Sequence, residues 1–120
     1  MDDPQAVVQA QLEAFNTRDI EAFVACYAPD AQILRFPSGG LIAEGHQEIR
    51  QRWGHLFAED PDLQARVASR MVSEGFVIDD ERAFIRGRQD DGIVIYEVRD
   101  GLIRRCWFVV WDMDLEVGSS

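Results

Sequence analysis

One histidine, one tyrosine and one aspartate of this sequence are candidates for proton transfer in an enzyme. His46, Tyr96 and Asp112 stand far apart in the chain, each beside or near apolar residues. A positioned side chain of these types can take a proton from one atom of a ligand and return it to another. Each also has a plainer interpretation: a surface residue near a helix start, a core phenol and a solvated strand end.

The local sequence suggests how each of these three groups could act. His46 lies three residues before Ile49 in the first turn of a predicted helix, where the helix dipole favours the neutral imidazole that accepts a proton. Tyr96 alternates with Val94 and Val98, so its phenol points inward if those valines do. Burial of Asp112 would disfavour its ionised form and suit it to proton transfer. These three residues are therefore the candidate catalytic groups.

Other chemistries are excluded or disfavoured by residue types. All twelve basic residues are arginine, so neither a Schiff base nor a P-loop lysine is available. Cys26 and Cys106 match no CxxC pattern, and we expect a reduced pair of small apolar residues rather than a disulfide or ligand pair. His46 and His55 are nine residues apart and lie on opposite helix faces. We predict no metal site and no cofactor.

The elements that must position these residues begin with two short amphipathic helices within residues 7–31. One apolar face of the first helix contains Val8, Leu12 and Phe15, with Gln11 on its flank. The second helix has its apolar face at Ile20, Phe23, Val24 and Tyr27. We expect Asp19 to cap the second helix and Pro29 to stop it.

The rest of the chain predicts one more helix and several strands. A strand at 32–36 and a return segment at 41–43 flank a turn, and a helix opening at Gly45 has an apolar stripe of Ile49, Trp53, Leu56 and Phe57. Strands are then expected at 64–78, 82–88, 93–98 and 102–112, with turns at 79–81, 89–92 and 99–101. A change of apolar parity predicts a β-bulge near 73–75. The acidic residues at 79–81 and 90–91 are interpreted as solvated turns.

Size and charge limit the classes of protein that the chain could belong to. With 120 residues we expect one domain over 1–117 and a flexible tail at 118–120. The net charge of −10 argues against nucleic acid and anionic membranes as partners, and the longest apolar run is too short to span a bilayer. Because the amino end is acidic and lacks a positive, apolar leader, we expect a cytoplasmic location.

The last strand predicts a partner. Residues 106–111 are apolar at six successive positions, which indicates that both faces of this strand are dry. Helices can cover one face, but nothing in a chain of this length is left to cover the convex face of the sheet. We therefore expect a homodimer through that face, the alternative being a monomer with an exposed aromatic patch.

The order of these segments resembles the nuclear transport factor 2-like superfamily. The resemblance is carried by AVVQAQLEAFNTRDIEAFVACYAPDA, by the helix start GHQEIRQRW after PSGG, and by the IYEVRDGLIRRCWFVVWD hairpin. The FAEDPDLQARV and FVIDDE segments are similar to uncharacterised bacterial steroid isomerase-like members. The resemblance implies an α+β, cone-shaped, cystatin-like fold with three N-terminal helices packed in a strongly bent antiparallel sheet.

The same resemblance implies a largely apolar cavity inside the cone, which we expect to bind an apolar small molecule. The residues expected to line it are Gln11, Leu12, Phe15, Tyr27, Phe36, Trp53, Phe57, Val94, Tyr96 and Trp107. A buried carboxyl or imidazole pointing into the cavity would favour catalysis of the isomerase or cyclase type. A cavity without a titratable group would favour a non-catalytic ligand-binding or assembly module.

Comparison with the enzymes of the superfamily narrows the chemistry. The tyrosine, the base and the oxyanion aspartate of ketosteroid isomerases fall at or near Gln11, Phe36 and Val94, so all three groups are replaced. The Asp-Arg-Asp set of limonene epoxide hydrolases has no match. Trp107 and Asp112 resemble the tryptophan and aspartate near the end of the last strand in SnoaL-type cyclases, which implies proton transfer by Asp112.

Overall fold

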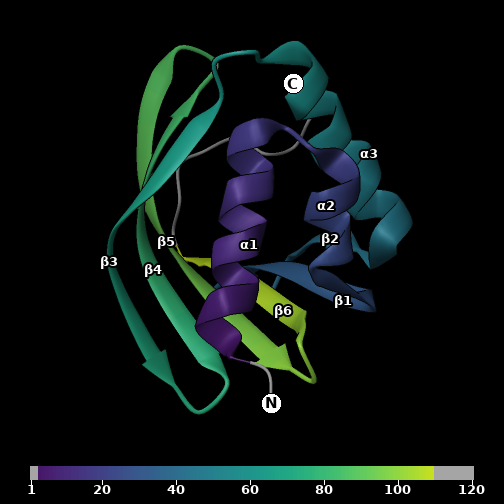
Figure 1. Cartoon of the computed structure of the whole chain (residues 1–120), viewed down its shortest axis with the longest axis vertical. Coiled ribbons are helices and arrows are strands. Elements are labelled where there is room, and N and C mark those ends of the chain that lie inside the picture. Colours follow the sequence, from purple (N-terminus) through teal and green to yellow (C-terminus); the bar gives the residue numbers. More distant parts are fainter. Residues whose placement is uncertain (1–2, 110–120) are drawn as a thin grey trace.

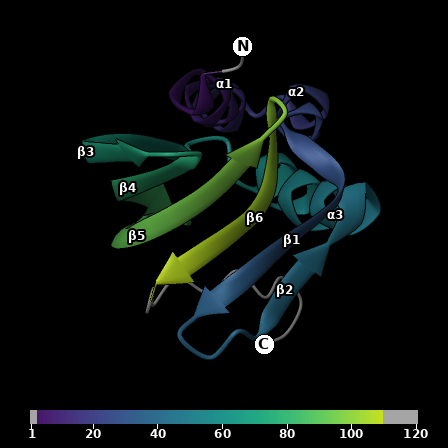
Figure 2. The ribbon, with the colours of Figure 1, turned by 90° about the horizontal axis from the view of Figure 1, so that it is seen from below.

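The computed structural model describes residues 3–109, which form three helices and one curved, open sheet. The helices are α1 (Pro4–Thr17), α2 (Ile20–Ala25) and α3 (Gly45–Glu59). The strands are β1 (Tyr27–Phe36), β2 (Leu41–Glu44), β3 (Gln64–Ser73), β4 (Phe76–Ile85), β5 (Arg88–Arg99) and β6 (Leu102–Val109). Their order in the sheet is β2-β1-β6-β5-β4-β3, and the helices lie in its concave side (Figures 1 and 2). The predicted α+β fold is confirmed.

One strand pairing differs from the expected antiparallel sheet. The pair β1 and β6 is parallel, whereas the other four pairs are antiparallel. The last strand reaches the first one only after the chain has passed through α3 and three antiparallel strands, and it then runs in the same direction as β1. This pairing joins the two halves of the curved sheet (Figure 2).

The second helix starts as expected but ends early. The Asp19 side chain accepts a hydrogen bond from the Ala22 amide at 3.1 Å, which confirms Asp19 as the N-cap of α2. The expectation that Pro29 stops this helix is wrong, because the helix ends at Ala25 and Pro29 lies inside β1, which begins five residues before the predicted strand. The Cys26 carbonyl accepts a hydrogen bond from the Ile103 amide of β6 at 2.9 Å. Pairing with β6 thus takes the place of a further helical turn.

The three hairpins that join β3 to β6 place their turns at residue pairs that end in glycine. Both residues of Glu74-Gly75, Arg86-Gly87 and Asp100-Gly101 have positive φ, as two-residue hairpin turns with the twist of a sheet require. The predicted turns at 79–81 and 89–92 are therefore wrong, since these residues lie inside β4 and β5. The register shift in β3 is at Val67/Ser69, rather than at the predicted bulge near 73–75, where the chain turns.

The core lies between the helices and the concave face of the sheet. Phe23 of α2 is fully buried and contacts the rings of Phe15, Tyr27, Trp53 and Phe57 at centroid distances of 5.3–6.3 Å. The predicted stripe on α3 is buried as expected. Of the helices described, none combines the length and the apolar character that crossing a bilayer requires.

Candidate functional site

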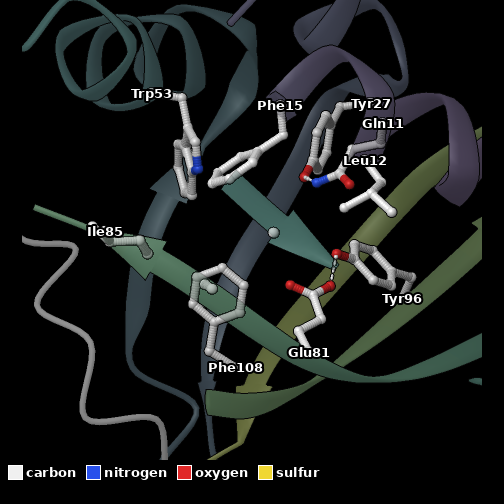
Figure 3. A pocket seen from close by; sticks show the side chains of 11 residues that line it. Gln11, Leu12, Phe15, Tyr27, Trp53, Glu81, Ile85, Tyr96 and Phe108 are labelled. Carbon is white, nitrogen blue, oxygen red and sulfur yellow. Dashed lines mark hydrogen bonds between the residues drawn. The ribbon is translucent and has the colours of Figure 1, made fainter. Parts of the chain in front are cut away.

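A narrow pocket lies between α1, α3 and the concave face of the sheet (Figure 3). Its volume is about 30 Å³, which is room for one or two water molecules. Most of its wall is aromatic or aliphatic. The lining residues are Gln11, Leu12, Phe15, Tyr27, Trp53, Ala65, Glu81, Ala83, Ile85, Tyr96 and Phe108.

Glu81 is the acidic side chain in this wall. It lies in the middle of β4, on the same face as the buried Val77 and Ala83, and only 8% of it is exposed. The Tyr96 hydroxyl on β5 donates a hydrogen bond to Glu81 Oε2 at 3.0 Å. The other carboxylate oxygen points into the pocket, away from Tyr96 (Figure 3). That oxygen is thus available to a ligand.

Burial sets the protonation of Glu81. The pKa of Glu81 is raised from 4.5 to about 7, chiefly by loss of solvent; the Tyr96 hydrogen bond and the Arg70 charge lower it, and the nearby Asp79 charge raises it. A carboxyl with this pKa exists in both protonation states near neutral pH. It can therefore act as a base and, after taking a proton, as an acid.

A second polar pair lies on the helix side of the pocket. Gln11 Nε2 on α1 donates a hydrogen bond to Tyr27 Oη at 2.9 Å, and both side chains are buried. Burial raises the pKa of Tyr27 and of Tyr96 well above 10, so both phenols keep their protons. Because Tyr27 Oη accepts from Gln11, its own O–H remains able to donate to a ligand oxygen.

The other deeply buried carboxyl of β4 is already neutralised. Asp79 is 1% exposed, and Arg70 on β3 donates to it through Nε at 2.6 Å and Nη2 at 2.9 Å. Arg70 Nη1 also donates to Gln9 Oε1 on α1 at 3.1 Å. This pairing occupies the guanidinium group, and in the described residues Glu81 has no arginine hydrogen-bonded to it.

The structure brings together six of the residues that were predicted for the site. Tyr96, one of the candidate catalytic groups, lines the pocket, as do five of the expected ligand-binding residues: Gln11, Leu12, Phe15, Tyr27 and Trp53. The first helix, the start of β1, α3 and β5 thus converge as the sequence indicated.

Other predicted residues lie elsewhere. His46 is half-buried, and its Nε2 is 2.7 Å from the Tyr27 carbonyl oxygen, so it is bound to the backbone outside the pocket wall. Phe36 is 48% exposed, while Phe57 and Val94 are buried without lining the pocket. Asp112 lies outside the described residues.

Trp107 also lies away from the pocket, and Phe108 takes the place predicted for it. The register pairs Tyr96 with Cys106 and Ile95 with Trp107, so Trp107 shares the convex face with Ile95. The Arg105 guanidinium lies 5.5 Å from the Trp107 ring centroid, a cation–π contact on that face. Phe108, two residues after Cys106, points into the pocket (Figure 3).

Sequence reasoning missed Glu81 because the acidic triplet 79–81 was interpreted as a solvated turn. A usable signal was present in the two Xaa-Gly pairs at 74–75 and 86–87. With turns at those pairs, the intervening strand alternates as Val77, Asp79, Glu81, Ala83 and Ile85 on one face. That alternation would have placed two carboxyls on the buried side of the sheet.

Comparison with known proteins places this geometry in a family. The SnoaL-like domain matches residues 8–106. An uncharacterized cystatin-fold protein of Novosphingobium aromaticivorans superposes with a TM-score of 0.82 at 19% identity, over 90% of this chain and 97% of that one. A Kribbella flavida protein named "putative ketosteroid isomerase" gives a TM-score of 0.75 at 22% identity, over 92% of this chain and 78% of that one.

A computationally designed 17-OHP binder has the same fold, with a TM-score of 0.77 at 20% identity over 90% of this chain and 91% of that one. No curated protein sequence matches the chain. At these identities the solved structures establish the fold alone. The domain match, which spans most of the chain, establishes the family: this protein belongs to the SnoaL-like domain family and has the nuclear transport factor 2-like fold.

Proposed function

We propose that this domain binds a small, mostly apolar molecule in the pocket and moves a proton on it, with Glu81 as the acid–base group. The observation that carries the proposal is the buried Glu81 carboxyl, which has one oxygen held by Tyr96 and the other directed into an aromatic pocket. A carboxyl with a pKa of about 7 accepts and releases protons readily near neutral pH.

The arrangement suits isomerisation of a carbonyl compound. The Glu81 carboxylate takes a proton from the carbon next to a ligand carbonyl, and the electron pair of that C–H bond moves into the enolate. The Tyr27 O–H, with its oxygen held by Gln11, donates to the enolate oxygen. For a β,γ-unsaturated carbonyl compound the enolate is a dienolate, and protonated Glu81 returns the proton to its γ-carbon, so the carboxylate is restored and the double bond moves into conjugation with the carbonyl group.

The name of one structural neighbour and the residues of this chain support this reaction class. The Kribbella flavida neighbour carries a ketosteroid isomerase name, so the fold is associated with proton transfer of this kind. In the present chain Gln11 and Val94 occupy two of the positions expected for isomerase groups, and Glu81 and Tyr27 supply a base and a donor from other positions. The pocket of about 30 Å³ admits the reacting group of such a ligand.

The test uses cyclohex-3-enone, a small β,γ-unsaturated ketone whose conjugation is followed by ultraviolet absorbance. The wild-type protein is expected to accelerate conjugation, with a rate that rises through about pH 7 as Glu81 ionises. Glu81→Gln, which keeps the Tyr96 hydrogen bond, should lose about 100-fold or more of the rate. The exposed-side neighbour Asp80→Asn is the control. An unchanged rate in Glu81→Gln would refute the role of Glu81.

A non-catalytic binding module is the second candidate function. The designed 17-OHP binder demonstrates that a protein of this fold can be built as a binder. In support, two of the positions expected for the isomerase groups hold Gln11 and Phe36, which cannot transfer protons. Ligands that raise the melting temperature without being converted would favour this function over isomerisation.

We also propose that the domain forms a homodimer through the convex face of the sheet. One apolar row crosses all six strands in register: Met71, Ile78, Ile95, Trp107, Leu34 and Leu41. Ile93 and Phe36 lie on the adjacent row and are 42% and 48% exposed. A self-complementary apolar face of this kind is best covered by a second copy.

The thiols support a reducing compartment. Cys26 and Cys106 are both free, and burial raises the pKa of the Cys106 thiol, which keeps it unreactive. The acidic net charge of −10 fits partners other than nucleic acid. We propose a cytoplasmic location, to be checked by cell fractionation.

A further inference from the structure

We propose that the head group recognised by this pocket is a protonated amine, with Glu81 as its counter-ion and the surrounding aromatic rings as its wall. This inference rests on the binding part of the proposed function and is independent of any proton transfer on carbon. It follows from the charges, the wall chemistry and the size of the pocket.

The charge balance of the pocket calls for a cation. Glu81 is the acidic residue among the described residues of the wall, which include no arginine or histidine, and the chain has no lysine. Tyr27 and Tyr96 stay protonated, and Arg70 is committed to Asp79 and Gln9. A bound anion would be repelled by the Glu81 carboxylate, whereas a bound cation would give that carboxylate a counter-ion.

The free Glu81 oxygen supplies the directional contact. One carboxylate oxygen accepts from Tyr96 at 3.0 Å, and the second is directed toward the centre of the pocket (Figure 3). An N⁺–H group placed there would donate a charge-assisted hydrogen bond, roughly twice as strong as a neutral one. A residue more than nine-tenths buried, with an oxygen aimed at the cavity, is a ready partner for an ammonium group.

The wall suits a cation in a second way. Phe15, Trp53 and Phe108 bring three aromatic rings to the pocket, and the Trp53 and Phe108 centroids are 6.5 Å apart. Aromatic faces attract ammonium groups, and more strongly where water is excluded. Leu12 and Ile85 add aliphatic surface for the hydrocarbon part of the ligand. A carboxylate within an aromatic wall thus recognises both the charged group and the hydrocarbon chain of an alkylammonium.

Size and long-range charge agree with this assignment. An ammonium group is about as large as a water molecule and fits a pocket of about 30 Å³. The net charge of −10 raises the local concentration of cations and lowers that of anions around the protein. Both features favour a slender primary amine as the first ligand to test.

The experiment compares n-butylamine, 1-butanol and butyrate, which share a chain and differ in charge. Dissociation constants are measured at pH 8 by ¹H–¹⁵N NMR titration of the full-length protein. We expect butylamine to bind at least tenfold more tightly than butanol, and butyrate not to bind. At pH 6, where Glu81 is mostly protonated, butylamine should move the Glu81 carboxyl ¹³C signal to its ionised position.

Two variants and one control make the assignment specific. Glu81→Gln should lose the preference for butylamine and bind butanol at least as well, while Asp80→Asn, on the opposite face of β4, should behave as wild type. Phe108→Leu should weaken butylamine binding more than butanol binding. The ¹H–¹⁵N spectrum of each variant reports whether it is folded, so Phe108→Leu remains informative if Glu81→Gln unfolds.

The outcomes separate this inference from the proposed function. Equal or tighter binding of butanol would overturn the amine assignment and leave pocket binding intact. Binding of butylamine that survives Glu81→Gln would also overturn it. If none of the three compounds binds, the amine assignment fails, whereas the isomerase proposal is still judged separately by conjugation of cyclohex-3-enone.

Discussion

Glu81 determines the chemistry of the pocket at the scale of the single residue. A β-strand places it on the buried face beside Asp79, yet the two carboxyls differ because Arg70 neutralises only Asp79 through a bidentate ion pair. Glu81 is left with a phenol as its partner, which lowers its pKa less than burial raises it. Two acids two residues apart thus have different environments, and proton-transfer sites commonly contain such pairs.

The raised pKa of Glu81 has a consequence for stability. The folded protein holds the proton more tightly than the unfolded chain, so the contribution of Glu81 is fully favourable below pH 4.5 and is lost as the pH rises through about 7. We expect wild type to lose about 3 kcal/mol more unfolding free energy than Glu81→Gln between pH 4.5 and pH 8.5.

Urea denaturation at the two pH values measures this difference. Other groups titrate in both proteins, and their contributions cancel in the comparison. If the unfolding free energies of the wild type and Glu81→Gln changed equally between the two pH values, the pKa of Glu81 would not be raised by folding.

The candidate site could be predicted from the sequence only in part. Helical spacing placed Leu12, Phe15 and Trp53 on inward faces and strand alternation did so for Tyr96, and all four line the pocket. The carboxyl was missed because three successive acidic residues are more often solvated than buried, whereas the Xaa-Gly turns at 74–75 and 86–87 place Glu81 on the inward face of β4. Inward placement of Phe108 instead of Trp107 depends on the β6 register, which the uninterrupted apolar run at 106–111 does not specify.

At the scale of the elements, the hairpin turns decide which residues face the pocket. Each turn between β3 and β6 uses two residues with positive φ, the second of them a glycine, and the strands between these turns run without interruption. The third helix and the start of the second follow directly from apolar spacing and the Asp19 cap. The strand boundaries do not follow from the same signals. Acidic clusters and glycines both occur in turns, but only the positive φ of a hairpin turn requires glycine.

One side chain ties the first helix to the edge strand of the pocket. Asn16, near the end of α1, donates through Nδ2 to the Ala65 carbonyl at 2.8 Å and accepts from the Ala65 amide at 2.7 Å. Asn16→Ala leaves both backbone groups without these partners. We predict a loss of about 1–3 kcal/mol in unfolding free energy, measured by urea denaturation.

Asn16→Asp provides the matched control for that prediction. It keeps an acceptor for the Ala65 amide and loses only the donor, so an intermediate loss is expected. A change below about 0.5 kcal/mol in Asn16→Ala would indicate that water replaces both bonds and that the contact does not fix the start of β3.

At the scale of the whole molecule, the convex face of the sheet decides whether two copies associate. Its apolar row is flanked by charged residues, among them Glu97, which accepts hydrogen bonds from Arg99 at 2.9 Å and from Arg105 at 2.7 Å. An apolar centre with a charged rim resembles a protein–protein interface. We predict that the wild type sediments at twice its chain mass of 13.7 kDa.

Ile93→Arg tests this prediction because Ile93 is 42% exposed, so the substitution leaves the core intact. Analytical ultracentrifugation should find this variant at the mass of one chain over concentrations where the wild type is a dimer. Gln51→Arg on α3 adds the same charge on another surface and should remain dimeric. A wild type that stays at 13.7 kDa at high concentration would contradict the dimer.

The central claim is that a buried, proton-exchanging carboxyl lies in the pocket, and a direct pKa measurement tests it. The Glu81 carboxyl ¹³C resonance, assigned by its absence in Glu81→Gln, is followed from pH 3 to pH 10. The account predicts a midpoint of about 7, which rises further in Tyr96→Phe because that variant removes the hydrogen bond to the ionised form. A midpoint close to 4.5 would contradict the account.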